Sequence, residues 1–333
     1  MDKLGKTIDV IVPCCNEEMS LDAFFKEASG TFSEIQGYNF RYIFIDDGST
    51  DGTLNKIKSL ALGSDENIKY ISFSRNFGKE AAMYAGLKNS SADYAVVIDA
   101  DLQHPPHLVK EMISKIEQTG CDSCAARRVS RKGEPKIRSI FARAFYKLMN
   151  RYSDIEIVDG AVDFRLMNRN MVKAIVSMPE NQRFSKGIFA WVGFETCWIE
   201  FENVKRVSGE SKWTVWGLTK YAVDGFLDFA ASPLKFAGVF GGLTTLFSAI
   251  YLIIEILKTL IFGKDTPGYA STICLILFFG GLIIAILSIM GEYIGRMYME
   301  TKGRPIYIEK ESNIEESSKK GQNIYELNTS EDK

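Results

Sequence analysis

The sequence is poor in histidine, the side chain that most often serves as a general base in catalysis. Its 333 residues contain only His104 and His107, which two prolines separate, so we interpret both as loop structure rather than as half of a Ser–His or Cys–His pair. An excess of basic charge is also missing, because 40 Lys and Arg residues face 42 Asp and Glu residues. Binding of nucleic acid through bulk charge needs such an excess. We therefore expect no nucleic-acid partner.

Neither a disulfide framework nor a signal peptide is visible. The six cysteines follow no regular spacing, which suggests reduced thiols in a cytosolic compartment. Cys121 and Cys124 form a single C-x-x-C, a weak zinc signal without a second pair, and we favour burial as small apolar side chains. Residues 1–13 have no long apolar core and no small-residue cleavage site, so we expect no secretory signal.

The common glycine-rich nucleotide motifs are missing as well. No G-x-G-x-x-G follows the first expected strand, which disfavours a dinucleotide-binding Rossmann site. Gly78 and Lys79 do not belong to a P-loop, because Phe73 stands in place of its first glycine and Glu80 in place of its Ser or Thr. Lys79 can instead offer a point charge to a phosphate.

Long hydrophobic runs are absent from the first 230 residues but present afterwards. Residues Phe236–Ile254 and Tyr269–Gly291 carry no formal charge, and each is long enough for a bilayer of roughly 30 Å. We expect two transmembrane helices that form a hairpin anchor. The positive-inside rule then puts both chain ends in the cytoplasm. The basic residues at the outer ends are Lys235, Arg296, Lys302, Arg304 and Lys310.

The segment before these runs has a mixed character. Residues Trp213–Ala231 combine aromatic and aliphatic side chains with Lys220, Asp224 and Asp228. This pattern predicts an amphipathic helix along the membrane surface, and the alternative is an ordinary surface helix packed on a domain. Beyond Glu311 the chain is polar and largely charged, which is typical of disorder.

Up to about residue 126, short β-rich apolar runs alternate with helical patterns. The expected strands are Ile8–Val12, Tyr42–Ile45, Ile68–Phe73, Tyr94–Ile98 and Ser123–Ala126. The expected helices are Leu21–Thr31, Gly52–Ala61, Glu80–Lys88 and Pro106–Thr119, with a further one near Ile137–Tyr152. Such alternation predicts an α/β fold of parallel strands with helices on both faces. Its ligand crevice lies beyond the carboxyl ends of the strands.

The sharpest site signal stands at one of these strand ends. Asp99 and Asp101, separated by Ala100, follow an apolar strand, and carboxylates spaced in this way can share one hard divalent cation with positions left for a diphosphate. We favour a metal site over the alternative, in which Asp101 caps the next helix. Asp46 and Asp47 end another strand, where an acid can accept hydrogen bonds from a nucleotide base or ribose.

The motifs VPCCNEE, IDDGSTDGT, SRNFGKEAAM, DADLQHPP and VDFRLM, taken in this order, resemble glycosyltransferase family 2 with the GT-A nucleotide-sugar-binding fold. The chain is most similar to the polyprenyl-phosphate glycosyltransferases, the group that contains dolichol-phosphate mannose synthase and the bactoprenol glucosyltransferases. The resemblance covers roughly residues 7–300 and includes the paired C-terminal spans. One departure is Cys15, where many members carry Tyr.

The resemblance implies a role for particular residues. Pro13, Glu17 and Asp47 would hold the uracil and ribose of a nucleotide sugar, with Lys79 nearby. Asp99, Asp101 and Gln103 would surround Mg²⁺ or Mn²⁺. Asp163 matches the acid with the catalytic role, which we assign together with Asp101. The basic positions near the acceptor phosphate would be Arg128, Arg131, Arg138 and Lys212.

The expected function is that of a membrane-bound inverting glycosyltransferase, which moves a hexose from a UDP-linked sugar to polyprenyl phosphate. Alternatives are a family 2 synthase with another lipid or glycan acceptor, and a catalytically silent membrane scaffold. We expect a GT-A catalytic domain over 1–210, an interface helix over 211–232, two transmembrane helices over 233–299 and a polar tail over 300–333. Glycines such as Gly241 and Gly280 permit close helix packing, in keeping with an expected homo-oligomer.

Overall fold

A computed structural model describes residues 5–63, 68–129, 150–151, 156–202 and 268–314, together with individual positions between 241 and 261. The strands are β1 (Lys6–Cys14), β2 (Tyr38–Asp46), β3 (Ile68–Phe73), β4 (Tyr94–Val97), β5 (Ser123–Arg128), β6 (Ala161–Asn168), β7 (Thr196–Phe201) and β8 (Glu309–Ser312). The helices are α1 (Leu21–Ser33), α2 (Thr53–Gly63), α3 (Lys79–Asn89), α4 (Leu108–Thr119), α6 (Arg169–Val176), α7 (Ser185–Trp191) and α10 (Tyr269–Thr301). Every element expected up to residue 126 is present at its place.

These strands form one sheet in the order β7-β5-β6-β4-β1-β2-β3-β8. Strand β1 pairs in parallel with β2 and β4, and β2 pairs in parallel with β3. Strand β6 is antiparallel to β4 and β5, and β8 is antiparallel to β3. The sheet is therefore mixed rather than parallel throughout. Both antiparallel strands come from parts of the chain where the strand–helix alternation does not extend.

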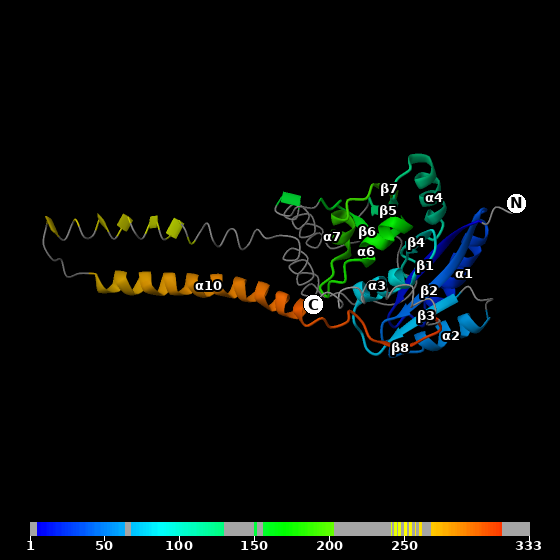
Figure 1. The fold of residues 1–333 in the computed structure, drawn as a ribbon, viewed down its shortest axis with the longest axis horizontal. Coiled ribbons are helices and arrows are strands. Elements are labelled where there is room, and N and C mark those ends of the chain that lie inside the picture. Colours follow the sequence, from blue (N-terminus) through cyan, green and yellow to red (C-terminus); the bar gives the residue numbers. More distant parts are fainter. Residues whose placement is uncertain are drawn as a thin grey trace, which may run out of the picture.

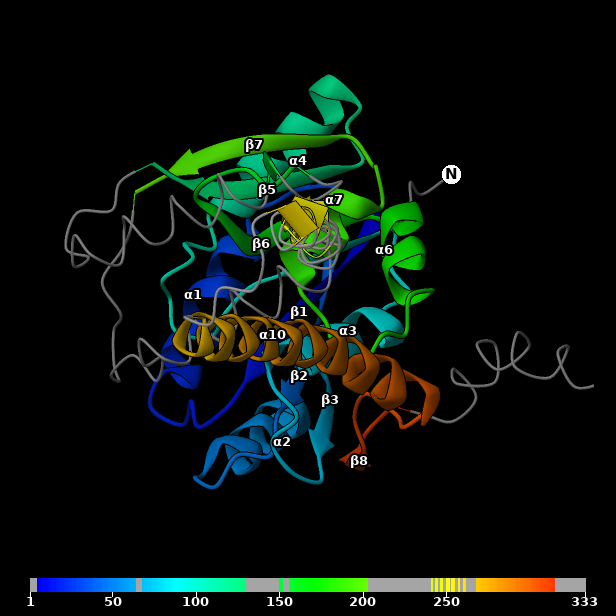
Figure 2. The same cartoon turned by 90° about the vertical axis from the view of Figure 1, so that its left-hand side faces the viewer.

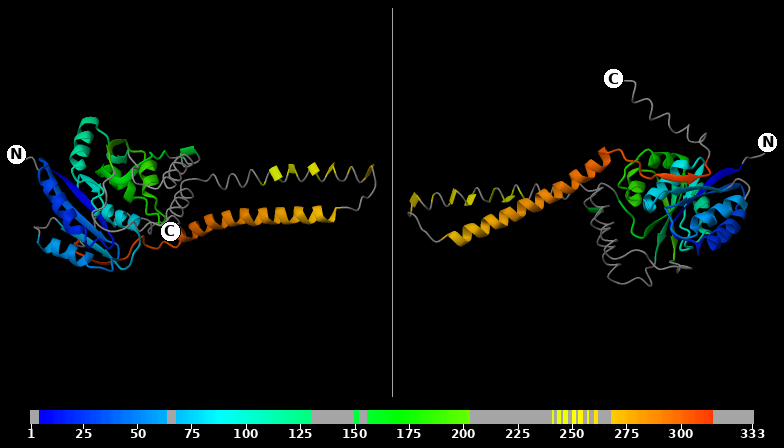
Figure 3. Two further views of the ribbon diagram at one scale, coloured as in Figure 1. Left: turned by 180° about the vertical axis from the view of Figure 1, so that it is seen from behind. Right: turned by 90° about the horizontal axis from the view of Figure 1, so that it is seen from below.

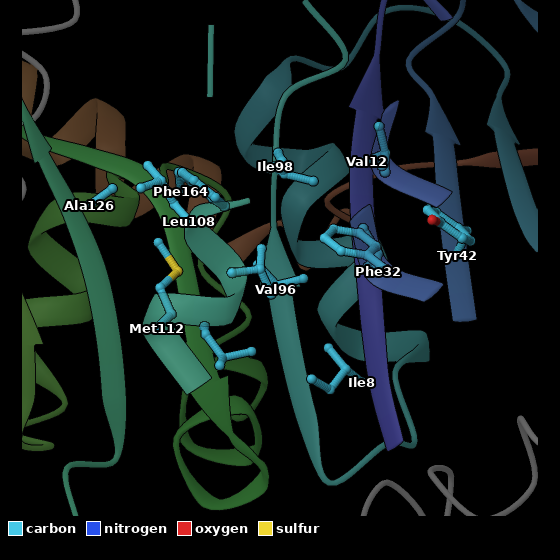
Figure 4. Packing of buried hydrophobic residues seen from close by; sticks show 14 of the residues in the cluster. Ile8, Val12, Phe32, Tyr42, Val96, Ile98, Leu108, Met112, Ala126 and Phe164 are labelled. Carbon is cyan, nitrogen blue, oxygen red and sulfur yellow. The ribbon is translucent and has the colours of Figure 1, made fainter. Parts of the chain in front are cut away.

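Helices cover both faces of the sheet (Figures 1 and 2). Val10 and Val12 of β1 pack with α1, α2 and α4, whereas Ile11 between them packs with α3, α6 and α7. This follows from the period of two along a strand, which sends neighbouring side chains to opposite faces. Figure 4 shows the first cluster, where Phe32 of α1 and Met112 of α4 lie against the sheet.

Helix α3 lies unusually close to the sheet. A Cβ atom built on Gly86 would be 2.3 Å from Ile11 Cγ2 and 2.8 Å from Ile45 Cδ1. Seven of the residues in this helix, from Ala81 to Leu87, are buried. Because Gly86 has no side chain, α3 can pack this close to the strands.

Helix α10 brings the chain back to the sheet, where the following residues form β8 (Figures 1 and 3). Strand β8 ends at Ser312, so the expected disorder beyond Glu311 is wrong for the residues up to 314, while the polar tail over 300–333 stays a prediction. Tyr307 stacks on Phe73 with ring centroids 4.7 Å apart, and Ile314 is 6% exposed. The charge of this segment hid a short edge strand, whose acidic side chains stay partly in solvent.

Several expected features lie outside the described residues. These are most of the helix near Ile137–Tyr152, the interface helix over 211–232, and three basic residues of the expected acceptor site. The three are Arg131, Arg138 and Lys212. Within the described part of the chain, one helical stretch, Phe278–Thr301, is long and apolar enough to cross a membrane.

Candidate active site

The sheet brings two distant carboxylates to one edge. Strands β1 to β4 are parallel, so their carboxyl ends share an edge, and β6 reaches the same edge with its first residues because it runs antiparallel to β4. Val97 of β4 is paired with Arg165 of β6. Continued by two residues, this register places Asp99 opposite Asp163.

Lys79 joins these two carboxylates. Its Nζ atom is 2.7 Å from Asp99 Oδ1 and 3.1 Å from Asp163 Oδ2. It also donates to Asp99 Oδ2 at 2.8 Å. Lys79 is the first residue of α3, the helix that follows β3. The cluster therefore combines residues that come after β3, after β4 and from β6. The three expected site residues therefore meet in one cluster.

Asp47 holds the loop that leads to Lys79. Its Oδ1 accepts a hydrogen bond from the Phe77 N–H at 2.6 Å, and its Oδ2 accepts one from the Gly78 N–H at 3.0 Å. Gly78 has a φ of +99°, which glycine adopts without steric cost. Burial raises the pKa of Asp47, while these two amide hydrogen bonds oppose the rise. Asp47 therefore has a structural contact here, and its expected contact with the nucleotide stays a prediction.

Charge compensation sets the ionisation of the cluster. Burial by itself would raise the pKa of Asp163, but the Lys79 ammonium, and next the Lys186 ammonium, outweigh it and lower the pKa to about 2. Burial likewise opposes ionisation of Asp99, and again Lys79 outweighs it, so the pKa of Asp99 is lowered. The pKa of Lys79 is raised by the two carboxylates against the effect of its own burial. Both acids are therefore anionic near neutral pH.

A strained turn follows Asp99. Leu102 has a φ of +57°, a region that bulky side chains rarely occupy, and its side chain is buried in the core. The Gln103 N–H donates to Asp101 Oδ1 at 3.0 Å. Backbone strain of this kind concentrates at functional sites. Asp101 lies in this turn, two residues after Asp99, and is buried.

The donor atoms at this edge suit a hard divalent cation. Among the described residues, no three His, Cys, Asp or Glu side chains are grouped so that they could hold a metal ion. Mg²⁺, however, is commonly held by one or two carboxylates together with substrate phosphates. Asp99 and Asp101 supply such oxygens, and Asp99 already accepts a cation, the Lys79 ammonium. The residues therefore fit a metal whose coordination is completed by a diphosphate.

The loop after β1 lies beside the loop after β2 at the same edge. The Asn16 Oδ1 atom accepts a hydrogen bond from the Thr50 N–H at 2.8 Å. The Glu17 N–H donates to Thr53 Oγ1 at 2.8 Å, and its carboxylate accepts from Ser20 Oγ at 2.7 Å. Pro13, at the end of β1, is half-buried. Both expected nucleotide-binding residues of this loop are thus at the edge where the cluster lies.

Arg128 is the expected acceptor residue that the structure describes. It ends β5, which is antiparallel to β6, so it lies at the same edge as Asp163. Its N–H donates to the Gly160 carbonyl oxygen at 2.9 Å. Gly160 in turn immediately precedes β6. The basic loop that follows Arg128 therefore starts next to the carboxylate cluster.

Two residues at this site were not assigned a role from the sequence. Lys186 in α7 lies close enough to Asp163 to lower the pKa of that acid. Its effect is smaller than those of burial and of Lys79. His104 is 3% exposed, and its Nδ1 atom is 3.5 Å from Asp99 Oδ2. The sequence signal for His104 is its place directly after Asp99, Asp101 and Gln103.

Comparison with known proteins identifies the family. The model of the family described as glycosyl transferase family 2 matches residues 9–176. CsbB of Bacillus subtilis (strain 168), whose name places it among the glycosyltransferases, is 43% identical over 307 residues, or 92% of each chain. The SfII prophage-derived bactoprenol glucosyl transferase of Shigella flexneri is 40% identical over 305 residues, which cover 92% of this chain and 98% of the relative.

Solved structures have a more distant likeness. The mannosyltransferase PcManGT from Pyrobaculum calidifontis, in complex with GDP-Man and Mn²⁺, is 14% identical with a TM-score of 0.47 and covers 85% of this chain and 86% of its own. The assignment rests on the family match and on relatives near 40% identity over most of the chain. This chain belongs to glycosyl transferase family 2 and is a glycosyltransferase with a GT-A-like α/β fold.

Proposed function

We propose that the enzyme transfers glucose from UDP-glucose to a polyprenyl phosphate at a membrane surface, with inversion at the anomeric carbon. The observation that carries the proposal is the cluster of Asp99, Lys79 and Asp163 at the carboxyl edge of the sheet. Glucose and a bactoprenol acceptor are suggested by the names of relatives about 40% identical, such as that of Shigella flexneri. The UDP moiety is our inference from the family resemblance.

A membrane location is supported by the path of the chain. Strand β8 follows α10 and pairs with β3, so the segments before residue 203 and after residue 308 lie on the same side of any membrane that α10 crosses. The chain between them must then cross an even number of times. We assign the second crossing to the run Phe236–Ile254, so that the two spans form a hairpin with both ends in the cytoplasm.

The apolar side chains of this region agree with a lipid environment. The described positions between Gly241 and Ile261 are helical and run alongside α10 (Figures 1 and 3). Phe247 is 70% exposed, Leu260 is 77% exposed and Ile284 is 66% exposed. Exposed apolar surface on this scale is unusual for a soluble protein. It supports contact with hydrocarbon and an enzyme of the cell membrane.

At the donor, Asp99 and Asp101 would hold Mg²⁺ or Mn²⁺, with Gln103 next to them. When bound, such an ion offsets the negative charge that gathers on the departing diphosphate. Lys79 is placed to add a second positive charge at the same point. Pro13 near the end of β1, together with Glu17 and Asp47 on the loops after β1 and β2, forms the side of the site that we assign to the uridine.

At the acceptor, a phosphate oxygen forms a bond to the anomeric carbon as the bond from that carbon to the UDP oxygen breaks. The electron pair leaves with UDP, and one displacement inverts the configuration. The acceptor phosphate is largely ionised near neutral pH, since its second pKa is about 6, so no strong base is needed. Asp163, anionic in this range, orients the acceptor and stabilises positive charge at the anomeric carbon, while Arg128 and the basic loop bind the phosphate.

The experiment is to incubate the detergent-purified enzyme with undecaprenyl phosphate and a panel of labelled nucleotide sugars. We expect label in the lipid phase from UDP-glucose, dependent on both undecaprenyl phosphate and Mg²⁺ or Mn²⁺. Equal release of free sugar with and without the lipid would contradict the acceptor assignment. Label from another donor alone would correct the sugar or the nucleotide and leave the acceptor in place.

A further inference from the structure

His104 lies in the candidate site but takes no part in the steps above. Its ring stacks on Phe164 with centroids 5.2 Å apart and an angle of 19° between the planes. It also meets Phe201 edge-on, with centroids 6.1 Å apart. These two aromatic contacts fix the plane of the imidazole. Neither ring nitrogen has a hydrogen-bond partner within the part of the chain that the structure describes.

The edge of this ring faces Asp99. The 3.5 Å between His104 Nδ1 and Asp99 Oδ2 is a few tenths of an ångström longer than a hydrogen bond. Lys79 now contacts both oxygens of Asp99. A carboxylate that turns towards a cation and a diphosphate cannot keep both of these contacts. A shift of a few tenths of an ångström would bring Asp99 Oδ2 within hydrogen-bonding distance of the imidazole.

We propose that His104 is a positioning residue for Asp99: its Nδ1–H donates to Asp99 Oδ2 and keeps that carboxylate directed at the place of the divalent cation that would bind the donor diphosphate, which frees Lys79 to approach the phosphates. The inference rests on the proposed place of Asp99 at the donor. Buried groups that orient a metal-binding side chain typically change metal affinity or activity by 10–100-fold when they are removed. The flanking rings of Phe164 and Phe201 make the imidazole rigid enough for this task.

The chain offers well-matched variants for a test. His104→Asn keeps an N–H close to the Nδ1 position, His104→Gln keeps one close to the Nε2 position, and His104→Phe keeps the ring stacking and removes both nitrogens. His107 is exposed and lies just before α4, so His107→Asn serves as the control. Thermal unfolding of each metal-free variant shows whether it folds.

The first readout is Mn²⁺ binding in the presence of UDP, followed by electron paramagnetic resonance without any transfer reaction. We expect His104→Phe and His104→Gln to bind Mn²⁺ about 10-fold or more weakly, while His104→Asn and the control stay within about 3-fold of the wild type. In turnover, the loss should fall on kcat more than on the KM for undecaprenyl phosphate. Wild-type Mn²⁺ affinity in a folded His104→Phe would overturn the inference, as would rescue by Gln but not by Asn.

The second readout needs no metal. Because the chain has two histidines, a ¹⁵N-histidine spectrum compared with that of His107→Asn assigns His104 directly. The inference predicts the Nδ1–H tautomer, and the Nε2–H tautomer would overturn it. Should the wild type transfer sugar without binding Mn²⁺, the proposed metal role of Asp99 would fail, and the tautomer would still decide the role of His104.

Discussion

At the scale of single residues, Lys79 shows how far the sequence leads. Phe73 and Glu80 on either side of it exclude a P-loop, and its position predicts a point charge for a phosphate. The structure adds that the ammonium bridges Asp99 and Asp163. That bridge depends on the antiparallel pairing of β4 with β6, which the less regular pattern after residue 127 does not predict.

Substitution of Lys79 by Gln should therefore damage the site in two ways. Both carboxylates lose their counter-charge, and the departing diphosphate loses a cation. We expect kcat for lipid-linked glucose formation to fall by about 10²–10³-fold, the usual loss when one group that stabilises transition-state charge is removed. Lys88→Gln, in the last turn of the same helix, is the control, and activity of Lys79→Gln equal to that control would contradict the bridge.

Other residues of the site were only partly predictable. Asp99 and Asp101 were predicted to bind a metal because carboxylates at a strand end have few structural uses, and this role stays a prediction. The contacts of Asp47 with the Phe77 and Gly78 amides were not foreseen, since the path of a loop from the next strand cannot be derived from strand order. His104 was placed in a loop, correctly, but its burial between aromatic rings depends on β6 and β7.

At the scale of elements, period-two and helical patterns predicted the strands and helices up to residue 126 because each lies against a continuous core. Strands β6, β7 and β8 were missed as strands. Charged residues interrupt their apolar pattern, among them Asp163, Glu200 and Lys310. Asp163, to which we assign the catalytic role, is therefore one of the residues that conceal β6 as a strand.

The close approach of α3 to the sheet gives a stability prediction. Gly86→Ala should destabilise the enzyme by about 1–3 kcal/mol, the usual cost of overpacking a core, because its new methyl group meets Ile11 and Ile45. Gly30→Ala on the exposed face of α1 has no atom within 4 Å of its new methyl and should stabilise by about 0.5–1 kcal/mol. Urea unfolding of both variants measures the difference. Destabilisation by Gly30→Ala, or none by Gly86→Ala, would contradict the packing.

The pairing of β8 with the sheet gives a second stability prediction. Besides strand pairing, Lys58 and Glu311 form an ion pair at 2.8 Å, and the Asn313 side chain bonds to Tyr70 N–H at 2.7 Å. Deletion of residues 305–333 should lower the thermal midpoint by several degrees, because burial of a side chain such as Ile314 is worth about 1.5–3 kcal/mol. Deletion of residues 315–333 keeps these contacts and is the control. Equal thermal midpoints for the two deletion variants would show that β8 contributes nothing to stability.

At the scale of the whole molecule, the pairing of β8 with β3 fixes both ends of the membrane segment to one domain. Glu300, at the end of α10, adds a contact by accepting a hydrogen bond from the Asn181 N–H at 3.0 Å. The C-terminal end of α10 is thus in contact with the domain that carries the candidate site. This contact between the domain and α10 agrees with the proposed acceptor, which has a lipid tail and a phosphate head.

This arrangement predicts the topology of the chain. Alkaline phosphatase inserted in the loop near residue 265 should be active outside the cytoplasm, whereas green fluorescent protein fused to the C-terminus should fluoresce inside it. The reason is that an even number of crossings returns the chain to the side of the catalytic domain. An inactive phosphatase near residue 265, or a C-terminal green fluorescent protein that does not fluoresce, would contradict a hairpin whose two ends are cytoplasmic.

The central claim is that the cluster around Asp163 transfers a sugar to a lipid phosphate. The most direct measurement compares the wild type with Asp163→Asn in the same membranes, with UDP-[¹⁴C]glucose and undecaprenyl phosphate as substrates. We predict a labelled lipid product from the wild type and a loss of at least about 100-fold in kcat for the variant. Full turnover by Asp163→Asn would contradict the account.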